Sequence, residues 1–162
     1  MLTFIIRLSM LMSWSTIFFV PKKSIKKYMP VTILTSLITV TVTFVGIHYR
    51  FWAVKGSERK RLWNLLSIIL GPFPVGCLWI FHLTFGKFKL YLLANLINNL
   101  IYAIGIIPFL EKANFIKYVK FSRIHHVIVA MIYSTIIYGY QLIYTKPNSK
   151  YLRLFIKKVL KL

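Results

Sequence analysis

Four polar side chains with helical spacing interrupt one of the most apolar stretches of the sequence. Asn95, Asn98, Asn99 and Tyr102 occupy positions i, i+3, i+4 and i+7, so they share one face of a helix. Their neighbours are mainly Leu, Ile and Ala, and amides in such surroundings need hydrogen-bond partners. Two interpretations stay open. The amides bond between helices, which is the commoner role, or they line a polar pocket for a small polar ligand or an ion.

A glycine and two prolines within another apolar run, residues 62–85, favour a pocket beside them. Gly71, Pro72 and Pro74 predict a helix kink, because each proline removes a backbone hydrogen bond and frees a carbonyl group. We expect one kinked helix over residues 62–85. The alternative is that residues 62–70 lie at a membrane surface, and that a shorter segment from about Pro74 turns back or tilts through the bilayer.

Small polar residues form comparable stripes in three further apolar runs, and their spacing predicts that they face a common interior. We expect these groups to bond between helices and to allow close approach of the backbones. The stripes are Ser9, Ser13 and Thr16; Thr32, Ser36, Thr39 and Thr43; and Ser134, Tyr138 and Gln141.

The histidines allow a second hypothesis, a haem or metal site. His48 ends one apolar run, and His125 and His126 begin another, so these side chains lie at the same membrane face if every run crosses. If residues 62–85 turn back, His48 and His125 fall on opposite faces. Histidine at a helix end is more often interfacial, and no carboxylate stands near to orient a ligand. We therefore expect no cofactor and no metal site.

Catalytic chemistry has little support in the sequence. The only acidic residues, Glu58 and Glu111, are each followed by basic residues and are typical of solvated loop or cap charges. Cys77 and His82 are five residues apart, so in a helix they point to different faces and do not form a nucleophile–base pair. We expect no catalytic residues, and we expect Cys77 to serve in packing.

Five apolar runs separated by short basic segments must position these side chains: residues 2–20, 31–47, 62–85, 90–110 and 124–144. In the second run, Pro30 is expected to open the helix, because a proline at the first position loses no hydrogen bond. We predict an all-α membrane helix bundle of about five transmembrane helices over residues 1–146. Its 162 residues leave no room for a separate soluble domain.

The charge balance agrees with a membrane location. The chain is 58% hydrophobic and carries 22 Lys and Arg against 2 acidic residues. Such a balance can indicate nucleic acid, but the long apolar runs exclude that class; cations at helix ends are suited to anionic lipid headgroups. The expected partners are therefore the lipid bilayer, its anionic headgroups and other membrane proteins, with no nucleic acid.

The last segment, residues 147–162, is predicted to be a basic amphipathic helix. Its apolar residues recur at helical spacing and its cations fall on other faces, which is typical of a helix that lies on a membrane. The anionic cytoplasmic leaflet would attract it, so a cytoplasmic C-terminus is favoured. The basic residues divide almost equally between the two expected faces and leave the orientation open.

Two stretches resemble a family of uncharacterised small multi-pass membrane proteins of spore-forming Gram-positive bacteria. The resemblance implies a bacterial plasma-membrane location and a bundle of about five helices, and it lends no activity. The first stretch is Phe18-Phe19-Val20-Pro21-Lys22-Lys23 through Tyr28-Met29-Pro30-Val31-Thr32, and the second comprises Gly71-Pro72-Phe73, Trp79-Ile80-Phe81, Thr84, Gly86-Lys87-Phe88, Tyr91-Leu92 and Asn95.

The leading functional hypothesis is a non-enzymatic structural or interaction component of a membrane assembly. The alternative is a small transport or ligand-binding module that uses a polar site beside the kinked third helix. The scarcity of titratable groups inside the apolar runs argues against an enzyme.

Overall fold

The computed structural model describes residues 2–145 and Val159, and the predicted tail helix over residues 147–162 otherwise lies outside these residues. Helical segments dominate, and the elements in chain order are α1 (Leu2–Met12), the 3₁₀-helix η1 (Ser13–Phe19), α2 (Lys22–His48), β1 (Trp52–Val54), α3 (Glu58–Leu70), α4 (Pro72–Thr84), α5 (Phe88–Leu100), the π-helix η2 (Ile101–Ile106), α6 (Ile107–Lys112), β2 (Ile116–Tyr118) and α7 (Arg123–Thr145).

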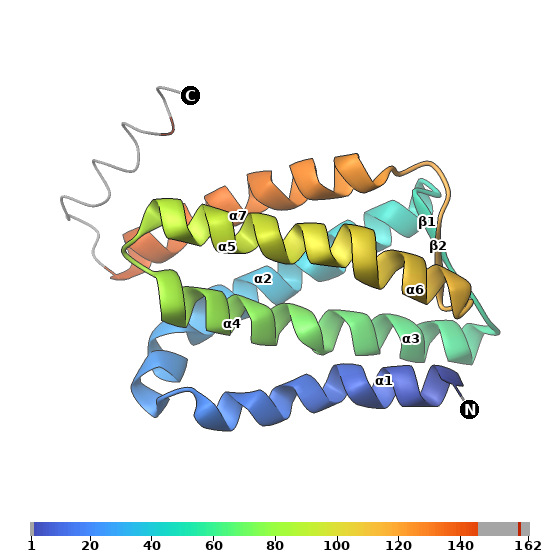
Figure 1. The fold of residues 1–162 in the computed structure, drawn as a ribbon, viewed down its shortest axis with the longest axis horizontal. Coiled ribbons are helices and arrows are strands. Elements are labelled where there is room, and N and C mark those ends of the chain that lie inside the picture. The colour runs from blue at the N-terminus through green and yellow to red at the C-terminus, as the bar shows by residue number, and fades with distance from the viewer. Residues whose placement is uncertain (1, 146–158, 160–162) are drawn as a thin grey trace.

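Five long helical runs form a bundle, as the apolar runs predict. Each is long and apolar enough to cross a membrane: Leu2–Phe19, Lys22–His48, Glu58–Thr84, Phe88–Lys112 and Arg123–Thr145. Figure 1 shows them lying roughly alongside one another, with the turns gathered at the two ends.

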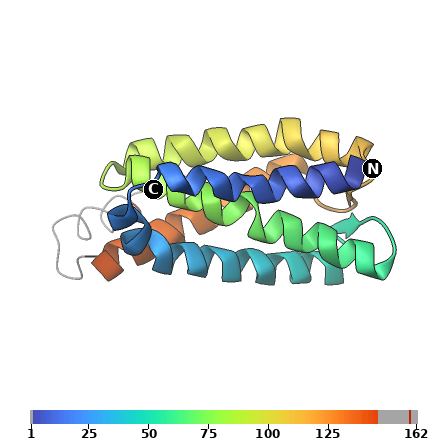
Figure 2. The same ribbon diagram turned by 90° about the horizontal axis from the view of Figure 1, so that it is seen from below.

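The first run is peripheral, whereas the other four enclose the core. α1 packs against α3 and η1 packs against α4, and only 6% of the first run is buried. Figure 2, which views the bundle from below, shows α1 in front of α3 and α4. The main core cluster lies between α2, α4, α5 and α7 and includes Val31, Leu78, Phe81, Tyr91 and Ile137.

The second helix begins earlier than the sequence suggests. It starts at Lys22, directly after Pro21, so Pro30 lies inside the helix and the expectation that Pro30 opens it was wrong. Proline deprives the carbonyl of Lys26 of its usual donor, but near a helix end water can serve that group. The neighbouring Lys27 carbonyl accepts a hydrogen bond from Gln141 Nε2 at 3.2 Å.

The helix of the third run is interrupted at Gly71, beside the two prolines. The helix stops at Leu70 and resumes at Pro72, and Gly71 between them has φ −85° and ψ −99°, outside the helical region. Figure 1 shows α3 and α4 one after the other along the bundle, so residues 58–84 traverse it once and do not turn back.

Two features were not foreseen from the sequence. A short antiparallel ribbon joins the loops after α2 and α6 at one end of the bundle, with Trp52 opposite Tyr118 and Val54 opposite Ile116. The fourth run widens into the π-helix η2, in which the Ile107 N–H bonds to the Tyr102 carbonyl five residues back. Pro108 follows and has no N–H to offer the Ile104 carbonyl, which favours this local change of winding.

Candidate functional site

The four predicted polar residues all line one pocket in the interior of the bundle. Asn95, Asn98, Asn99 and Tyr102 form one wall of a cavity of about 100 Å³. The opposite walls come from α2, α4 and α7, and include Pro72 beside the helix interruption. The amide face of the fourth run and the break in the third run are therefore adjacent, as the pocket interpretation requires.

Asn95 links α5 to α7 through one of its two side-chain hydrogen bonds. Its Nδ2 donates to the Tyr91 carbonyl at 2.8 Å, and its Oδ1 accepts from Ser134 Oγ at 3.2 Å. The Tyr91 hydroxyl donates in turn to the Ser134 carbonyl at 3.0 Å. For Asn95, the interpretation as a hydrogen bond between helices is the one the geometry supports.

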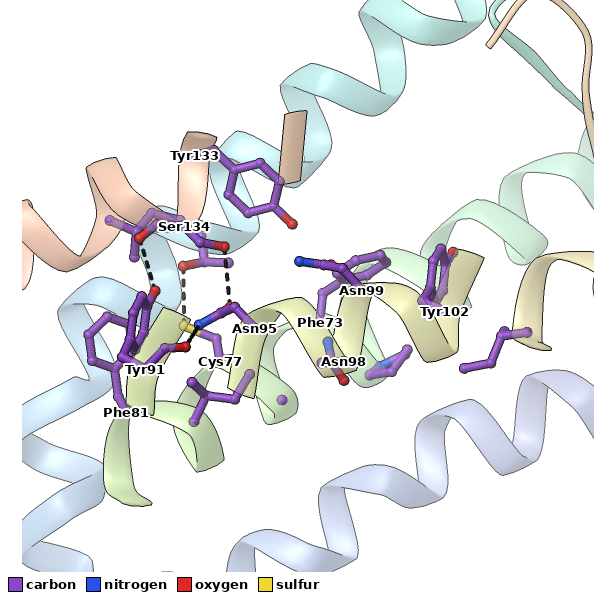
Figure 3. A pocket seen from close by; sticks show the side chains of 16 residues that line it. Phe73, Cys77, Phe81, Tyr91, Asn95, Asn98, Asn99, Tyr102, Tyr133 and Ser134 are labelled. Carbon is purple, nitrogen blue, oxygen red and sulfur yellow. Dashed lines mark hydrogen bonds between the residues drawn. The ribbon is translucent and has the colours of Figure 1, made fainter. Parts of the chain in front are cut away.

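Asn98 and Asn99 have hydrogen-bonding capacity to spare. The Asn99 Nδ2 lies 4.0 Å from Met131 Sδ, a weak acceptor, and its oxygen has no partner within residues 2–145. Asn98 is exposed, and its side chain forms no hydrogen bond with the described residues. Figure 3 shows Asn95 and Asn99 directed toward α7, and Asn98 on the side of α5 that faces α1. Two amides are thus available to a ligand.

Tyr102 separates this pocket from a second cavity of about 80 Å³. Its ring packs edge-on against Phe73 at 5.5 Å and stacks on His126 at 5.1 Å between centroids. Phe73, Tyr102 and Tyr133 line both cavities. These three rings therefore form the partition between the two spaces.

A carbonyl freed by the prolines is used elsewhere and is not offered to the pocket. Pro74 has no N–H for the Leu70 carbonyl, and Trp14 Nε1 donates to that oxygen at 2.6 Å from the first run. The hypothesis that freed carbonyls contribute to the polar site was therefore wrong for Leu70. The available polar groups of the pocket are side chains.

Gly76 gives the pocket part of its volume. An added Cβ at this position of α4 would meet no atom within 4 Å, and the residue lines the cavity. Sequence reasoning did not single out Gly76, because a lone glycine in an apolar helix carries no signal of what lies opposite it.

Cys77 lies in the pocket wall, where its Sγ is 3.2 Å from Thr35 Oγ1. His82 does not approach it, because His82 Nδ1 contacts Ser24 Oγ at 3.0 Å near the start of α2. The two residues therefore form no nucleophile–base pair, and Cys77 packs between α2 and α4.

The other three histidines gather at the ribbon end of the bundle but make separate contacts. His126 Nδ1 lies 3.0 Å from the Tyr118 hydroxyl, and His125 Nδ1 lies 2.7 Å from Ser122 Oγ, whereas His48 packs edge-on against Tyr49. Burial raises the pKa of the Tyr118 phenol above its ordinary value, so it stays protonated at neutral pH. Within the part of the chain that the structure describes, no three His, Cys, Asp or Glu side chains are grouped to hold a metal ion.

Both acidic residues take part in local contacts. Glu111 accepts the Tyr118 backbone N–H at 3.0 Å and lies 3.6 Å from Arg123, so it braces the ribbon. Glu58 pairs with Arg61 at 3.9 Å on the surface. Neither carboxylate lines the amide pocket.

Most of the hydroxyl stripes bond to their own helices. Thr32, Ser36 and Thr39 donate to the carbonyl four residues earlier, and Ser9, Ser13 and Thr16 donate to the carbonyl three residues earlier. Ser9 and Thr16 are exposed, so the prediction that they face a common interior was wrong. Thr16 does bond between helices, because its Oγ1 also accepts from Trp79 Nε1 of α4 at 3.0 Å.

The third stripe does join helices, through Ser134 and through Gln141, which is completely buried.

Comparison of the chain with protein-family models, with curated proteins and with solved structures finds no match.

Proposed function

We propose that this chain is an integral protein of a bacterial plasma membrane whose inner helices hold a small, neutral, polar ligand in the amide-lined pocket. The observation that carries the proposal is the pair Asn98 and Asn99, two amides on a cavity wall with unused hydrogen-bonding groups. An unpaired amide inside an apolar bundle is costly, and a bound molecule with hydroxyl or carbonyl groups would satisfy it.

The membrane location is supported by what the bundle exposes. Large apolar side chains cover its outside, including Phe4, Phe18, Leu37, Ile104 and Ile136, while the basic residues gather at the ends. A lipid environment suits this surface, since helices satisfy their own backbone groups. We propose that α3 and α4 form one kinked span and that residues 147–162 lie on the cytoplasmic surface.

Reporter fusions at each turn test the crossings. The expected result is alternation between the two sides of the membrane at every turn, with the C-terminus inside. Release of the protein into the supernatant by alkaline carbonate would contradict membrane insertion.

The chemistry of the pocket specifies a neutral ligand. No Lys, Arg, Asp, Glu or His of residues 2–145 lines it; its polar groups are amides, hydroxyls and a thiol. A charged ligand would lack a counter-charge in these apolar surroundings, whereas a hydroxyl or carbonyl group would not need one. The cavity of about 100 Å³ corresponds to roughly three water molecules at liquid density.

Identification of the molecule that copurifies with the protein tests this function. Wild-type protein is purified in mild detergent and denatured, and the small molecules released are identified by mass spectrometry. We expect a neutral oxygen-bearing species that is depleted in Gly76→Leu, because the new side chain enters the cavity. Gly105→Leu is the matched control, since Gly105 also meets no atom within 4 Å of an added Cβ but does not line the pocket. A molecule retained equally by both variants, or none at all, would contradict the proposal.

A second candidate function is assembly with other membrane proteins through the first run. Its support is the exposure of that helix, where Leu8, Leu11 and Trp14 are accessible and only 6% of the run is buried. Light scattering of the protein in mild detergent should then give a mass above one chain, and Leu8→Ala with Leu11→Ala should lower it. A monomer in the wild type would leave the exposed face to lipid alone.

A further inference from the structure

Building on the proposed function, we infer that the ligand is a neutral lipid whose hydroxyl- or carbonyl-bearing head enters the pocket sideways from the membrane, past Asn98. The pocket, its exposed amide and the apolar surface around that amide carry this inference.

The pocket reaches the outside of the bundle at Asn98. Asn98 lines the cavity and is exposed, and Ile106, another lining residue, is exposed as well. Figure 3 shows that Asn98 lies on the α1 side of α5, away from Asn95 and Asn99. Because α1 and η1 pack on α3 and α4, they leave this amide uncovered. The opening therefore faces the region that lipid would occupy.

An exposed amide within a span needs a partner that the membrane can supply. Asn98 is the eleventh residue of the run Phe88–Lys112 and so lies well away from both of its ends. Acyl chains offer no hydrogen bonds there, which makes an intramembrane polar group costly. A lipid hydroxyl group both donates and accepts hydrogen bonds, so it can bond to the N–H groups and to the oxygen of the Asn98 amide.

The volume of the cavity allows the head of a lipid to enter but not its acyl chain. A cavity of about 100 Å³ accepts a group the size of roughly three water molecules, and no acyl chain fits beside it. The chain would remain outside, against the exposed side chains of Leu93, Ile97 and Ile101 on the same helical run. A glycerol head with free hydroxyl and ester carbonyl groups would occupy the cavity, and the acyl chains attached to it would lie outside.

The charge distribution selects a neutral head over a phosphate. The basic residues nearest in sequence to α5, Lys87 and Lys89, lie at its start, several turns from Asn98, and no cation among the described residues lines the pocket. A phospholipid would leave its phosphate unpaired in the cavity. Diacylglycerol carries the required groups without a charge.

Photolabelling in nanodiscs tests this inference. The protein is reconstituted in phosphatidylcholine nanodiscs containing a diacylglycerol with a photoactivatable group near its head, and labelled peptides are mapped by mass spectrometry. We expect labelling of α4 and α5 in the wild type. Asn98→Leu should reduce it about fivefold, the effect of one lost hydrogen bond, and Gly76→Leu should reduce it further. Gly105→Leu should label as the wild type does.

Competitors distinguish this inference from the proposed function. Unlabelled diacylglycerol should displace the label, whereas free glycerol and phosphatidic acid should not. Displacement by glycerol would show that the pocket opens to water, which overturns lateral entry but leaves the proposed function intact. Labelling that Gly76→Leu and Asn98→Leu leave unchanged would also overturn the inference. If, in addition, the purified protein releases no neutral molecule on denaturation, the proposed function fails as well.

Discussion

The first and third helical runs differ more in environment than in composition. Both are apolar enough to cross a membrane, yet 6% of the Leu2–Phe19 run is buried against 44% of an apolar 18-residue window of the Glu58–Thr84 run. The third run packs on α2, α5 and the first run, whereas the first run packs mainly on α3 and α4. Apolar character thus identifies a candidate span without saying whether protein or lipid surrounds it.

The difference lies in what holds each run in place. The third run is fixed by side-chain packing around residues such as Leu78 and Phe81. The first run contributes one side chain, Ile6, to a smaller buried cluster with Ile107 and Leu110. Polar contacts add to its attachment: Arg7 Nε donates to Asn64 Oδ1 at 2.8 Å, and Trp79 Nε1 donates to Thr16 Oγ1 at 3.0 Å. Because lipid competes well for apolar contacts and poorly for hydrogen bonds, a peripheral helix gains most from polar attachment.

The substitution with the largest expected effect is Gly71→Ala, at the point where the two runs touch. The added Cβ would lie 2.5 Å from the Ser67 carbonyl oxygen and 2.8 Å from that of Met10, and both are backbone atoms. We expect a loss of about 3 kcal/mol in the free energy of unfolding, measured by SDS titration in mild micelles. A stability equal to that of the wild type would show that α1 does not approach α3 so closely.

Removal of the buried attachment at Arg7 should have the next largest effect. Arg7→Leu leaves Asn64, which is 1% exposed, without its donor. The expected loss is about 2 kcal/mol, measured in the same titration. Arg59→Leu, which removes an exposed cation near the same end without a contact of its own, should change stability little. If both variants lose the same free energy of unfolding, the loss comes from the removed positive charge and not from the bond between Arg7 and Asn64.

Trp14→Phe should have a smaller effect, confined to the first run. It keeps an aromatic ring but removes the donor to the Leu70 carbonyl. We expect a loss of about 1 kcal/mol and faster proteolysis of residues 2–19. Trp63→Phe is a suitable control, because the Trp63 indole N–H has no partner in the part of the chain described. Identical behaviour of the two variants would refute a role for the Trp14 bond.

Gly76→Ala in the third run should have the smallest effect and the opposite sign. The methyl group enters open space in the pocket, and alanine favours the helix by about 0.5 kcal/mol. A modest rise in thermal stability, followed by circular dichroism, is expected. A marked loss would mean that the pocket is already filled by protein atoms, which would also remove the basis of the ligand-binding proposal.

The sequence contains enough information for the five helices but not for their ends. Long apolar runs with few polar residues predict helices by length and hydropathy, which do not depend on tertiary contacts. Pro30 was misread because a proline inside a helix and one at its start look alike in sequence. The ribbon escaped detection because its strands, Trp52–Val54 and Ile116–Tyr118, are three residues each, which is too short for alternation to predict a strand.

The sequence predicts which residues of the fourth run line the pocket, but not which of their polar groups are already hydrogen-bonded. Asn95, Asn98, Asn99 and Tyr102 all line one pocket, although Asn98 is exposed and lies on the α1 side of α5, and the functional site itself stays a prediction. Which amides are already bonded depends on α7, far away in the sequence, and spacing alone contains no such information. The same limitation applies to the Leu70 carbonyl, whose donor Trp14 comes from another run.

The ribbon has a mechanical consequence for entry into the pocket. It ties the loop after α2 to the loop before α7, so those helices are clasped at one end, whereas the turn from α4 to α5 at the opposite end has no strand pairing. If the bundle opens, its helices should therefore pivot about the strands and separate most at the opposite end, where α4 turns into α5. Hydrogen–deuterium exchange should accordingly be slower in residues 52–54 and 116–118 than in residues 85–88.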